Sequence, residues 1–429
     1  MIKVYRSIKN IAHIVIDPIL NGLDRIKFKI ELFKTRRMYE LTVHKIQNRE
    51  EKKIKIAAYV IFDSTFGMES VFDRMMEDRA RWQPQIVVIP DVSRGKVNQL
   101  EVYNKTKEYF IRKYGRENVL DGWNIKNNSF YDHTRNFDII YFANPYDGMV
   151  NKVHSIRYAA TREVLPIYIS YGYDVGQITT ISRLKNAELN LVWKYFVDTT
   201  YSLEDMKKYQ IVKGENAILT GYSKMDKLND YVKKKTEKKK ILIAVHHTVD
   251  SEDLPLSNFL SYHKLFLELP RIYPDIEFVL RPHPLLFTTL INKGIWNRKQ
   301  VDEYIKEFEL RGGKYSCEGD YLQLFMDCDA MINDCGSFTI EWLYTGKAGC
   351  FMLNPRLKKS LLTNLMNRAI SCYSIAKEEQ DIIDFVDKVA RDKEVVHPIP
   401  SWIKDNIMLN YPDTASIIMK ELSISGEDI

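Results

Sequence analysis

The sequence lacks the features that mark secreted and membrane-spanning proteins. Cysteine is scarce: the five thiols all lie in the last third of the chain, and no two have Cys-x-x-Cys spacing. This pattern predicts reduced thiols and not a disulfide framework. No apolar run approaches the ~20 residues that a bilayer-spanning helix needs. The first twenty residues are interrupted by Lys9, His13, Asp17 and Pro18, so they lack the apolar core of a signal peptide. We therefore expect a cytosolic chain.

Three common nucleotide and metal motifs are also missing. The chain contains neither Gly-x-Gly-x-x-Gly nor Gly-x-x-x-x-Gly-Lys-Ser/Thr, which argues against dehydrogenases and P-loop kinases. No Asp-x-Asp stands at the carboxyl end of an expected strand, which disfavours a metal-dependent single-domain glycosyltransferase. We expect no bound metal and no cofactor.

Positive charge is concentrated at the N-terminus. Residues 1–53 hold 13 Lys or Arg against 6 Asp or Glu, a net charge of +7 in a chain whose total is +6. A nucleic-acid-binding body would carry a basic face of its own, so no nucleic-acid partner is expected. Apolar residues in this arm recur at helical spacing, which suits a helix on the inner face of an anionic membrane. A helical hairpin packed on the protein's own first domain fits the pattern equally well.

From residue 54 onward, short apolar runs alternate with amphipathic stretches. The runs expected to form buried strands are 54–62, 84–91, 137–145 and 165–173, and the expected helices between them include 69–82 and 102–115. A charged run at 233–240 interrupts the pattern. The alternation then restarts, with strands expected at 241–247, 278–284, 329–336 and 348–354 and a closing helix at 415–424. Strands alternating with helices predict parallel sheets covered on both faces.

The predicted fold is therefore α/β, with two Rossmann-like doubly wound domains that face a cleft. The expected parts are a basic helical arm (1–52), an acceptor domain (53–232), a nucleotide-donor domain (241–400) and a closing helical segment (401–429).

Ligands of open parallel sheets bind beyond the carboxyl ends of the strands. The run Asp334-Cys335-Gly336-Ser337 follows one expected strand and opens a helix, whose free N–H groups attract phosphate. Gly336 would let a ligand approach the backbone, and Ser337 would add a hydroxyl or cap the helix. Glu341, one turn later, could reach a ribose hydroxyl. An ordinary strand–helix turn and an exposed glutamate explain the same residues.

Two further loops carry histidine. Arg281 and His283 alternate with prolines, which hold the backbone so that a guanidinium and an imidazole can engage phosphate. His246 and His247 end another expected strand. If that strand continues, adjacent side chains point in opposite directions, so at most one of the two would face the cleft. No further zinc ligand stands nearby in the sequence, so we do not predict a zinc site.

The first domain offers one loop for the acceptor. Asp63 follows the strand at 54–62 and precedes a helix, where it or Glu69 could act as a general base. A plain turn with a Ser or Thr cap explains the loop equally well.

Taken together, several segments resemble the CDP-glycerol glycerophosphotransferase family, and more closely a branch found in capsule and surface-polysaccharide loci. The resembling segments are ILIAVHHTVD (241–250), FVLRPHPLL (278–286) and 321–352, with weaker matches at 192–209 and 221–228. Their order and spacing match over residues ~190–355, which is far more specific than any one motif. Residues 54–190 match only loosely, and the basic arm lies outside the resemblance.

The resemblance implies a GT-B fold and a CDP-polyol donor bound mainly by the second domain. By motif position, Arg281 and His283 match the family's donor-phosphate segment, Ser337 matches its pyrophosphate loop, and Glu341 matches an acidic position on the next helix. The family's polymerases carry a catalytic His-Gly pair after a first-domain strand. The counterpart here is Tyr171-Gly172, so the resemblance implies that the usual base is absent. Either Tyr171, another residue such as His154 or Asp63, or a different chemistry takes its place.

The leading functional prediction is transfer of a polyol-phosphate unit from a CDP-activated donor to a hydroxyl of a surface glycan or lipid-linked acceptor, as in teichoic-acid synthesis. A GT-B glycosyltransferase that uses a nucleotide sugar is the second hypothesis. The third, motivated by Tyr171, is a catalytically silent scaffold of an envelope-synthesis complex.

Overall fold

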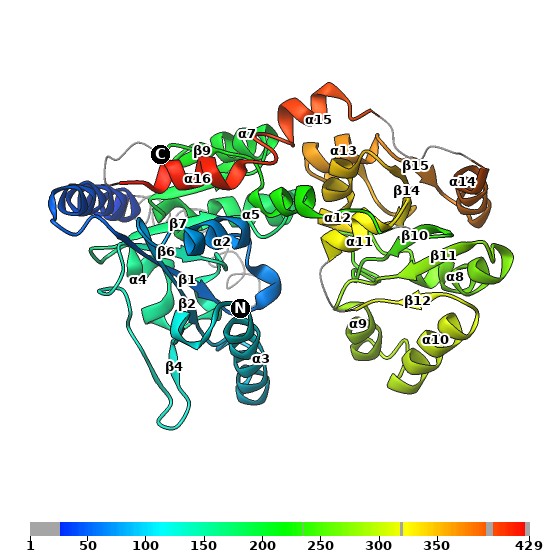
Figure 1. The fold of residues 1–429 in the computed structure, drawn as a ribbon, viewed down its shortest axis with the longest axis horizontal. Helices are drawn as coiled ribbons and strands as arrows, with labels where there is room; N and C mark the ends of the chain where they lie inside the picture. The colour runs from blue at the N-terminus through cyan, green and yellow to red at the C-terminus, as the bar shows by residue number, and fades with distance from the viewer. Residues whose placement is uncertain (1–25, 235, 318–320, 392–397, 425–429) are drawn as a thin grey trace, which may run out of the picture.

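The computed structural model describes residues 26–234, 236–317, 321–391 and 398–424 (Figure 1). Two α/β units lie side by side, each built around one parallel sheet. This confirms the predicted pair of doubly wound domains. Within the described residues, no helix is long and apolar enough to cross a membrane.

The sheet of the first domain has seven parallel strands in the order β3-β2-β1-β6-β7-β8-β9. Their bounds are β1 (Ile54–Val60), β2 (Trp82–Val88), β3 (Val119–Asp121), β6 (Ile139–Phe142), β7 (Leu165–Ile169), β8 (Lys194–Val197) and β9 (Ala217–Leu219). The connecting helices are α2 (Glu69–Glu77), α3 (Lys96–Tyr114), α4 (Ile156–Ala159), α5 (Gln177–Lys185), α6 (Ala187–Leu191) and α7 (Thr200–Tyr209). A short antiparallel hairpin, β4 (Trp123–Asn124) and β5 (Ser129–Phe130), projects from this domain.

The sheet of the second domain has six parallel strands in the order β12-β11-β10-β13-β14-β15. Their bounds are β10 (Lys239–Ala244), β11 (Ile276–Leu280), β12 (Lys314–Tyr315), β13 (Ala330–Asn333), β14 (Ala348–Met352) and β15 (Ser374–Ala376). The helices are α8 (Phe259–Ile272), α9 (Leu286–Asn292), α10 (Arg298–Leu310), α11 (Tyr321–Asp327), α12 (Gly336–Glu341), α13 (Asn364–Ile370) and α14 (Glu379–Arg391). The strand order reverses between β10 and β13, and such a switch point is where ligands of this architecture bind.

Burial explains why the apolar runs form strands. Each central strand is covered on both faces, so nearly every one of its residues is buried: in β6 all four are, and in β1 all but Lys55. Continuous apolar runs of this kind are typical of parallel sheets under two helical layers. Alternate residues of one strand enter different cores. In β1, Ile56 joins the core on one face and Tyr59 joins the core on the other.

The chain passes between the domains twice, and the two crossings are tied together. The first crossing follows β9 through a 3-10 helix, Ser223–Asp230. The second runs from α15 (Ser401–Asn406) back to α16 (Thr414–Leu422). The Asp226 carboxylate accepts a hydrogen bond from the Ala415 backbone N–H at 2.7 Å. Because Ile418 and Leu422 enter the core of the first domain, the predicted closing helix packs on that domain and not on the second.

The basic arm is described from residue 26 onward, and the structure shows one long helix over 26–48. The earlier half of the arm lies outside the described residues. One face of the helix packs on the first domain, where the Tyr39 hydroxyl donates to the Leu191 carbonyl at 2.6 Å and Ile46 is 3% exposed. The described part of the arm is thus one helix packed on the first domain, and the expected hairpin stays a prediction.

Candidate active site

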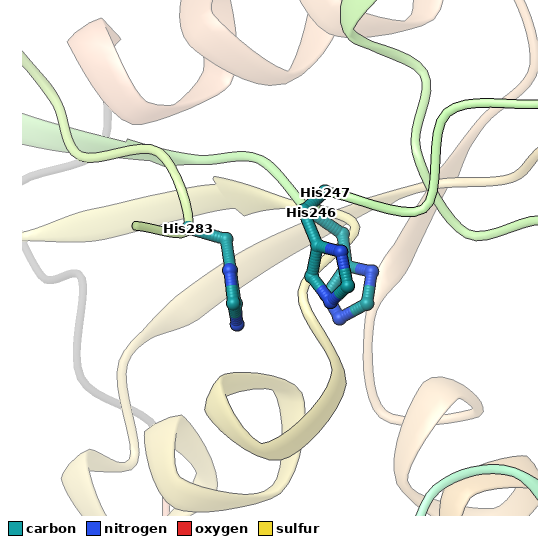
Figure 2. A group of neighbouring side chains, drawn as sticks. All are labelled: His246, His247 and His283. Atoms are coloured by element: carbon teal, nitrogen blue, oxygen red, sulfur yellow. The ribbon is translucent and has the colours of Figure 1, made fainter. Parts of the chain in front are cut away.

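Three histidines gather at the carboxyl edge of the second sheet, beyond β10 and β11. The ring centroids of His247 and His283 lie 4.2 Å apart, those of His246 and His247 4.5 Å, and those of His246 and His283 5.3 Å. Figure 2 shows all three rings projecting to the same side. The sequence analysis expected the adjacent pair to point in opposite directions if the strand continued, and the strand does not continue that far. Because β10 ends at Ala244, the alternation of side chains stops before the two histidines.

Backbone N–H groups determine which ring nitrogen carries the proton in two members of this histidine cluster (His246, His247 and His283). The Thr248 N–H donates to Nδ1 of His246 at 3.3 Å, and the Thr248 hydroxyl, 2.9 Å from the same nitrogen, can donate there as well. The Leu285 N–H donates to Nδ1 of His283 at 3.1 Å. A nitrogen that accepts a hydrogen bond holds a lone pair, so the proton of each neutral ring is on Nε2. His246 and His283 therefore present Nε2–H donors.

These tautomers bear on whether the cluster suits a metal ion. The candidate ligand atoms of the three rings lie within 4.8 Å of one another, close enough for small rotations to surround an ion. However, a metal-binding histidine coordinates through one nitrogen and donates a hydrogen bond from the other. In His246 and His283 the other nitrogen accepts from the backbone instead. The donor set therefore fits an anion better than a cation.

Burial disfavours the charged forms of all three histidines in the free protein. Burial, with repulsion from His247 and His283, holds the pKa of His246 well below its ordinary value. Burial, followed by the nearby His247, lowers the pKa of His283 to about 4. Burial also lowers the pKa of His247. A phosphate bound to His246 and His283 would favour the protonated forms of these two rings and so oppose the shift.

Arg281 supplies a positive charge two residues before His283 in the same loop. It follows the last residue of β11, and its backbone N–H donates to the Ile243 carbonyl at 2.9 Å. Its Nη1 donates to the Ser316 hydroxyl at 2.8 Å. This hydroxyl orients the guanidinium, a planar cation whose N–H groups can donate hydrogen bonds to phosphate oxygens.

Asp334 positions the histidine loop and does not face solvent. Its side chain is fully buried, and Oδ1 accepts the His246 backbone N–H at 2.6 Å. Oδ2 accepts the backbone and side-chain N–H groups of Asn258. Burial raises the pKa of this carboxyl to about 7. The sequence placed Asp334 against the nucleotide, whereas the structure shows it bracing the loop that carries His246.

Glu341 and Ser337 likewise bond to the protein. Glu341 is 2% exposed, and one carboxylate oxygen accepts the Tyr321 hydroxyl at 2.5 Å while the other accepts the Ser337 hydroxyl. In this structure Glu341 therefore holds Ser337 in place and does not reach toward a ribose. The Ser337 hydroxyl also accepts the Tyr173 backbone N–H at 3.2 Å, which joins the start of α12 to the first domain.

Gly336 lets the first domain approach. A Cβ at this position would lie 3.1 Å from Cγ2 of Val175, closer than nearly all real contacts of this kind. The sequence analysis predicted that Gly336 would let a ligand approach the backbone. In the structure the segment that approaches it is the loop after β7. The same loop brings the Tyr173 hydroxyl to 2.7 Å from the Tyr344 hydroxyl of the second domain. The carboxyl-edge loops of the two sheets thus meet around α12.

Tyr171 occupies this junction on the first-domain side. It is 38% exposed, and burial together with neighbouring Tyr146 raises its pKa to about 12. It is consequently protonated near neutral pH and can donate a hydrogen bond but not remove a proton. Tyr146, which the sequence did not single out, also lies partly exposed at 37%.

The other candidate bases differ in accessibility. Asp63 begins a 3-10 turn after β1 and is partly exposed. Glu69 forms ion pairs with Lys113 and with Lys227, the latter at 2.8 Å. His154 is 1% exposed, and its Nε2 contacts the Tyr131 carbonyl at 3.0 Å. Burial lowers the pKa of His154 to about 4, so this residue is part of the core.

Comparison with known proteins places this arrangement in a fold group. No family model matches the sequence, and no curated protein matches it. The solved structures that it resembles include a wall teichoic acid polymerase, TagF, soaked with CDPG, at 14% identity and a TM-score of 0.52, covering 95% of this chain and 97% of that one. They also include the UDP-GlcNAc 2-epimerase of Neisseria meningitidis bound to UDP-GlcNAc, at 14% identity and a TM-score of 0.51, covering 86% and 99%.

A third similar structure is the UDP-GlcNAc 2-epimerase of Methanocaldococcus jannaschii with UDP-GlcNAc and UDP, at 11% identity and a TM-score of 0.52, covering 86% and 99%. At such identities the likeness establishes the fold alone. It confirms the predicted GT-B architecture.

Proposed function

We propose that this protein transfers a polyol-phosphate unit, of the glycerol-phosphate or ribitol-phosphate kind, from a CDP-activated donor to a hydroxyl of a surface glycan or lipid-linked acceptor. The observation that carries the proposal is the histidine cluster at the switch point of the second sheet, with Arg281 two residues before His283 in the same loop. Two preset Nε2–H donors and one permanent cation form a site for a diphosphate. The likeness to TagF, whose structure was soaked with CDPG, supports the same donor class.

In the proposed reaction the acceptor oxygen forms a bond to the β-phosphorus of the donor. The bond between that phosphorus and the bridging oxygen breaks, and CMP leaves with the electron pair. Nε2–H of His246, Nε2–H of His283 and the Arg281 guanidinium stabilise negative charge on the phosphate oxygens as it develops. This assigns the three side chains to electrostatic stabilisation.

The acceptor hydroxyl must also lose its proton. Tyr171 is protonated near neutral pH, and its phenol is therefore assigned to donating a hydrogen bond. Among the described residues the His247 ring makes no hydrogen bond, and its lowered pKa keeps it neutral with a lone pair. We assign the general-base role to His247, with Asp63 as the other accessible candidate.

A second function has a specific observation in its favour. The similar structures with UDP and UDP-GlcNAc support a nucleotide-sugar donor on the same scaffold. In that reaction the bond broken is at the anomeric carbon and the leaving group is a nucleoside diphosphate.

A ligand panel tests the donor class. Ligands that bind only the folded state stabilise it by about 2.7 kcal/mol at a hundredfold excess over Kd, and so raise its melting temperature. We expect CMP, CDP-glycerol or CDP-ribitol to stabilise the native chain, and UDP-sugars to do so less. Stabilisation by uridine nucleotides alone would replace the proposal with the glycosyltransferase, and no stabilisation by any nucleotide would support the silent scaffold.

Turnover is then assayed with the stabilising donor and a panel of lipid-linked glycans. Phosphotransfer leaves a phosphodiester in the product and releases CMP, both visible by phosphorus NMR. His283→Ala should lose most of this activity while its melting temperature without ligand stays near that of the native protein.

A further inference from the structure

The helix over residues 26–48 has a second apolar face that nothing in the described structure covers. Ile26, Ile30, Phe33 and Leu41 are 57%, 52%, 68% and 63% exposed. At 3.6 residues per turn, these positions fall within about 80° of one another around the helix axis. They lie opposite the face that packs on the first domain through Tyr39 and its neighbours. We call these four residues the outer face.

Soluble proteins rarely leave several large apolar side chains exposed along one helix, so the outer face indicates a binding surface. In Figure 1 this helix, drawn in dark blue, lies on the side of the first domain away from the second domain. A partner could therefore cover it without entering the region between the two sheets.

Charge identifies the kind of partner. Residues 26–48 contain six Lys or Arg and two Asp or Glu. Of the two acids, Glu31 forms an ion pair with Arg157 of the first domain at 3.1 Å. By the same geometry Lys29 and Lys34 border the outer face on its two sides, and Arg37 lies within it between Phe33 and Leu41. Within the described residues, Lys29, Lys34 and Arg37 make no ion pair.

This arrangement fits a lipid surface better than a protein. Cations beside an apolar stripe can contact acidic headgroups while Ile and Phe side chains enter the acyl region. A second copy of this chain would bring the same cations together, and like charges repel. From this geometry we propose that the outer face binds an anionic phospholipid bilayer as a helix lying in the membrane plane. The proposal concerns a surface remote from the histidine cluster and does not depend on the donor.

Vesicle sedimentation of the full chain tests the proposal. The native protein should pellet with phosphatidylcholine vesicles that contain about one third phosphatidylglycerol, and much less with phosphatidylcholine alone, because acidic lipid attracts the bordering cations. The double variant Ile30→Glu, Phe33→Glu should lower the partition coefficient about tenfold or more, because it places charge in the acyl region. A triple variant, Lys29→Gln, Lys34→Gln, Arg37→Gln, should lower it only on the acidic vesicles, by up to about fivefold per residue.

The matched control carries the same charge change elsewhere. Val97 and Leu310 are 84% and 71% exposed on other helices, so Val97→Glu with Leu310→Glu should keep native binding. Equal loss in the control, or unchanged binding by the outer-face variant, would overturn the proposal. So would a lipid-free dimer, detected by light scattering, that the outer-face variant converts to a monomer. Because the assay uses no nucleotide, its result is separate from that of the ligand panel.

Discussion

Binding of a diphosphate should be coupled to proton uptake by the histidine cluster. In the free protein, burial and neighbouring histidines keep all three rings neutral, and the pKa of His283 is about 4. A phosphate dianion beside His246 and His283 favours their protonated form and raises their pKa, and the added proton displaces the backbone N–H from Nδ1 of the ring. At a pH between the pKa of a ring in the free protein and its pKa in the complex, the complex therefore holds more protons than the free protein.

The magnitude follows from linkage. If one ring rises from about 4 to near its ordinary 6.5, affinity increases by up to about tenfold per pH unit as pH falls from 6.5 toward 4. Above pH 6.5 the affinity should depend only weakly on pH. If two coupled rings changed in this way, the affinity would increase by up to about a hundredfold per pH unit.

Titration calorimetry with CMP or CDP-glycerol measures this effect. The observed heat should vary with the ionisation enthalpy of the buffer, because protons are taken from the buffer on binding. His283→Gln, which retains an N–H donor but cannot titrate, should keep part of the affinity and lose part of the proton uptake. Binding that is independent of buffer and of pH between 5 and 7 would refute the assignment of the cluster to phosphate.

The other predictions concern residues that support the site. Asp334→Ala removes the acceptor of the His246 and Asn258 N–H groups and leaves them buried, so urea unfolding should show a loss of about 2–5 kcal/mol in stability. Gly336→Val forces a side chain against the loop after β7 and should lower the melting temperature and weaken nucleotide binding, at a cost of about 1–3 kcal/mol. Burial raises the pKa of Asp226 to about 7, above its unfolded value near 3.9, so its contribution to stability is full below pH 4 and is lost as pH rises to 7. Asp226→Asn should flatten that part of the stability–pH curve, measured by urea unfolding at several pH values.

The periodicity of apolar residues alone determined the fold class. Buried strands such as β1 and β10 read as continuous apolar runs because two helical layers cover them, and the charged run before β10 marked where the pattern restarts. The sequence also indicated His283, because its rigid Pro-flanked loop follows a strand. These features depend on neighbours along the chain, and local pattern is sufficient to find them.

The roles of the other polar residues were decided by contacts between distant segments. His246 and His247 lie together because β10 ends at Ala244, three residues before the end expected from the sequence at 247. Asp334 became a buried brace because Asn258, 76 residues away, donates to it. Whether a carboxylate meets a ligand or an internal N–H group depends on which segments bury it, and tertiary packing alone sets that. The helix over 26–48 illustrates both levels: its amphipathic pattern is local, but only the fold shows which face remains exposed.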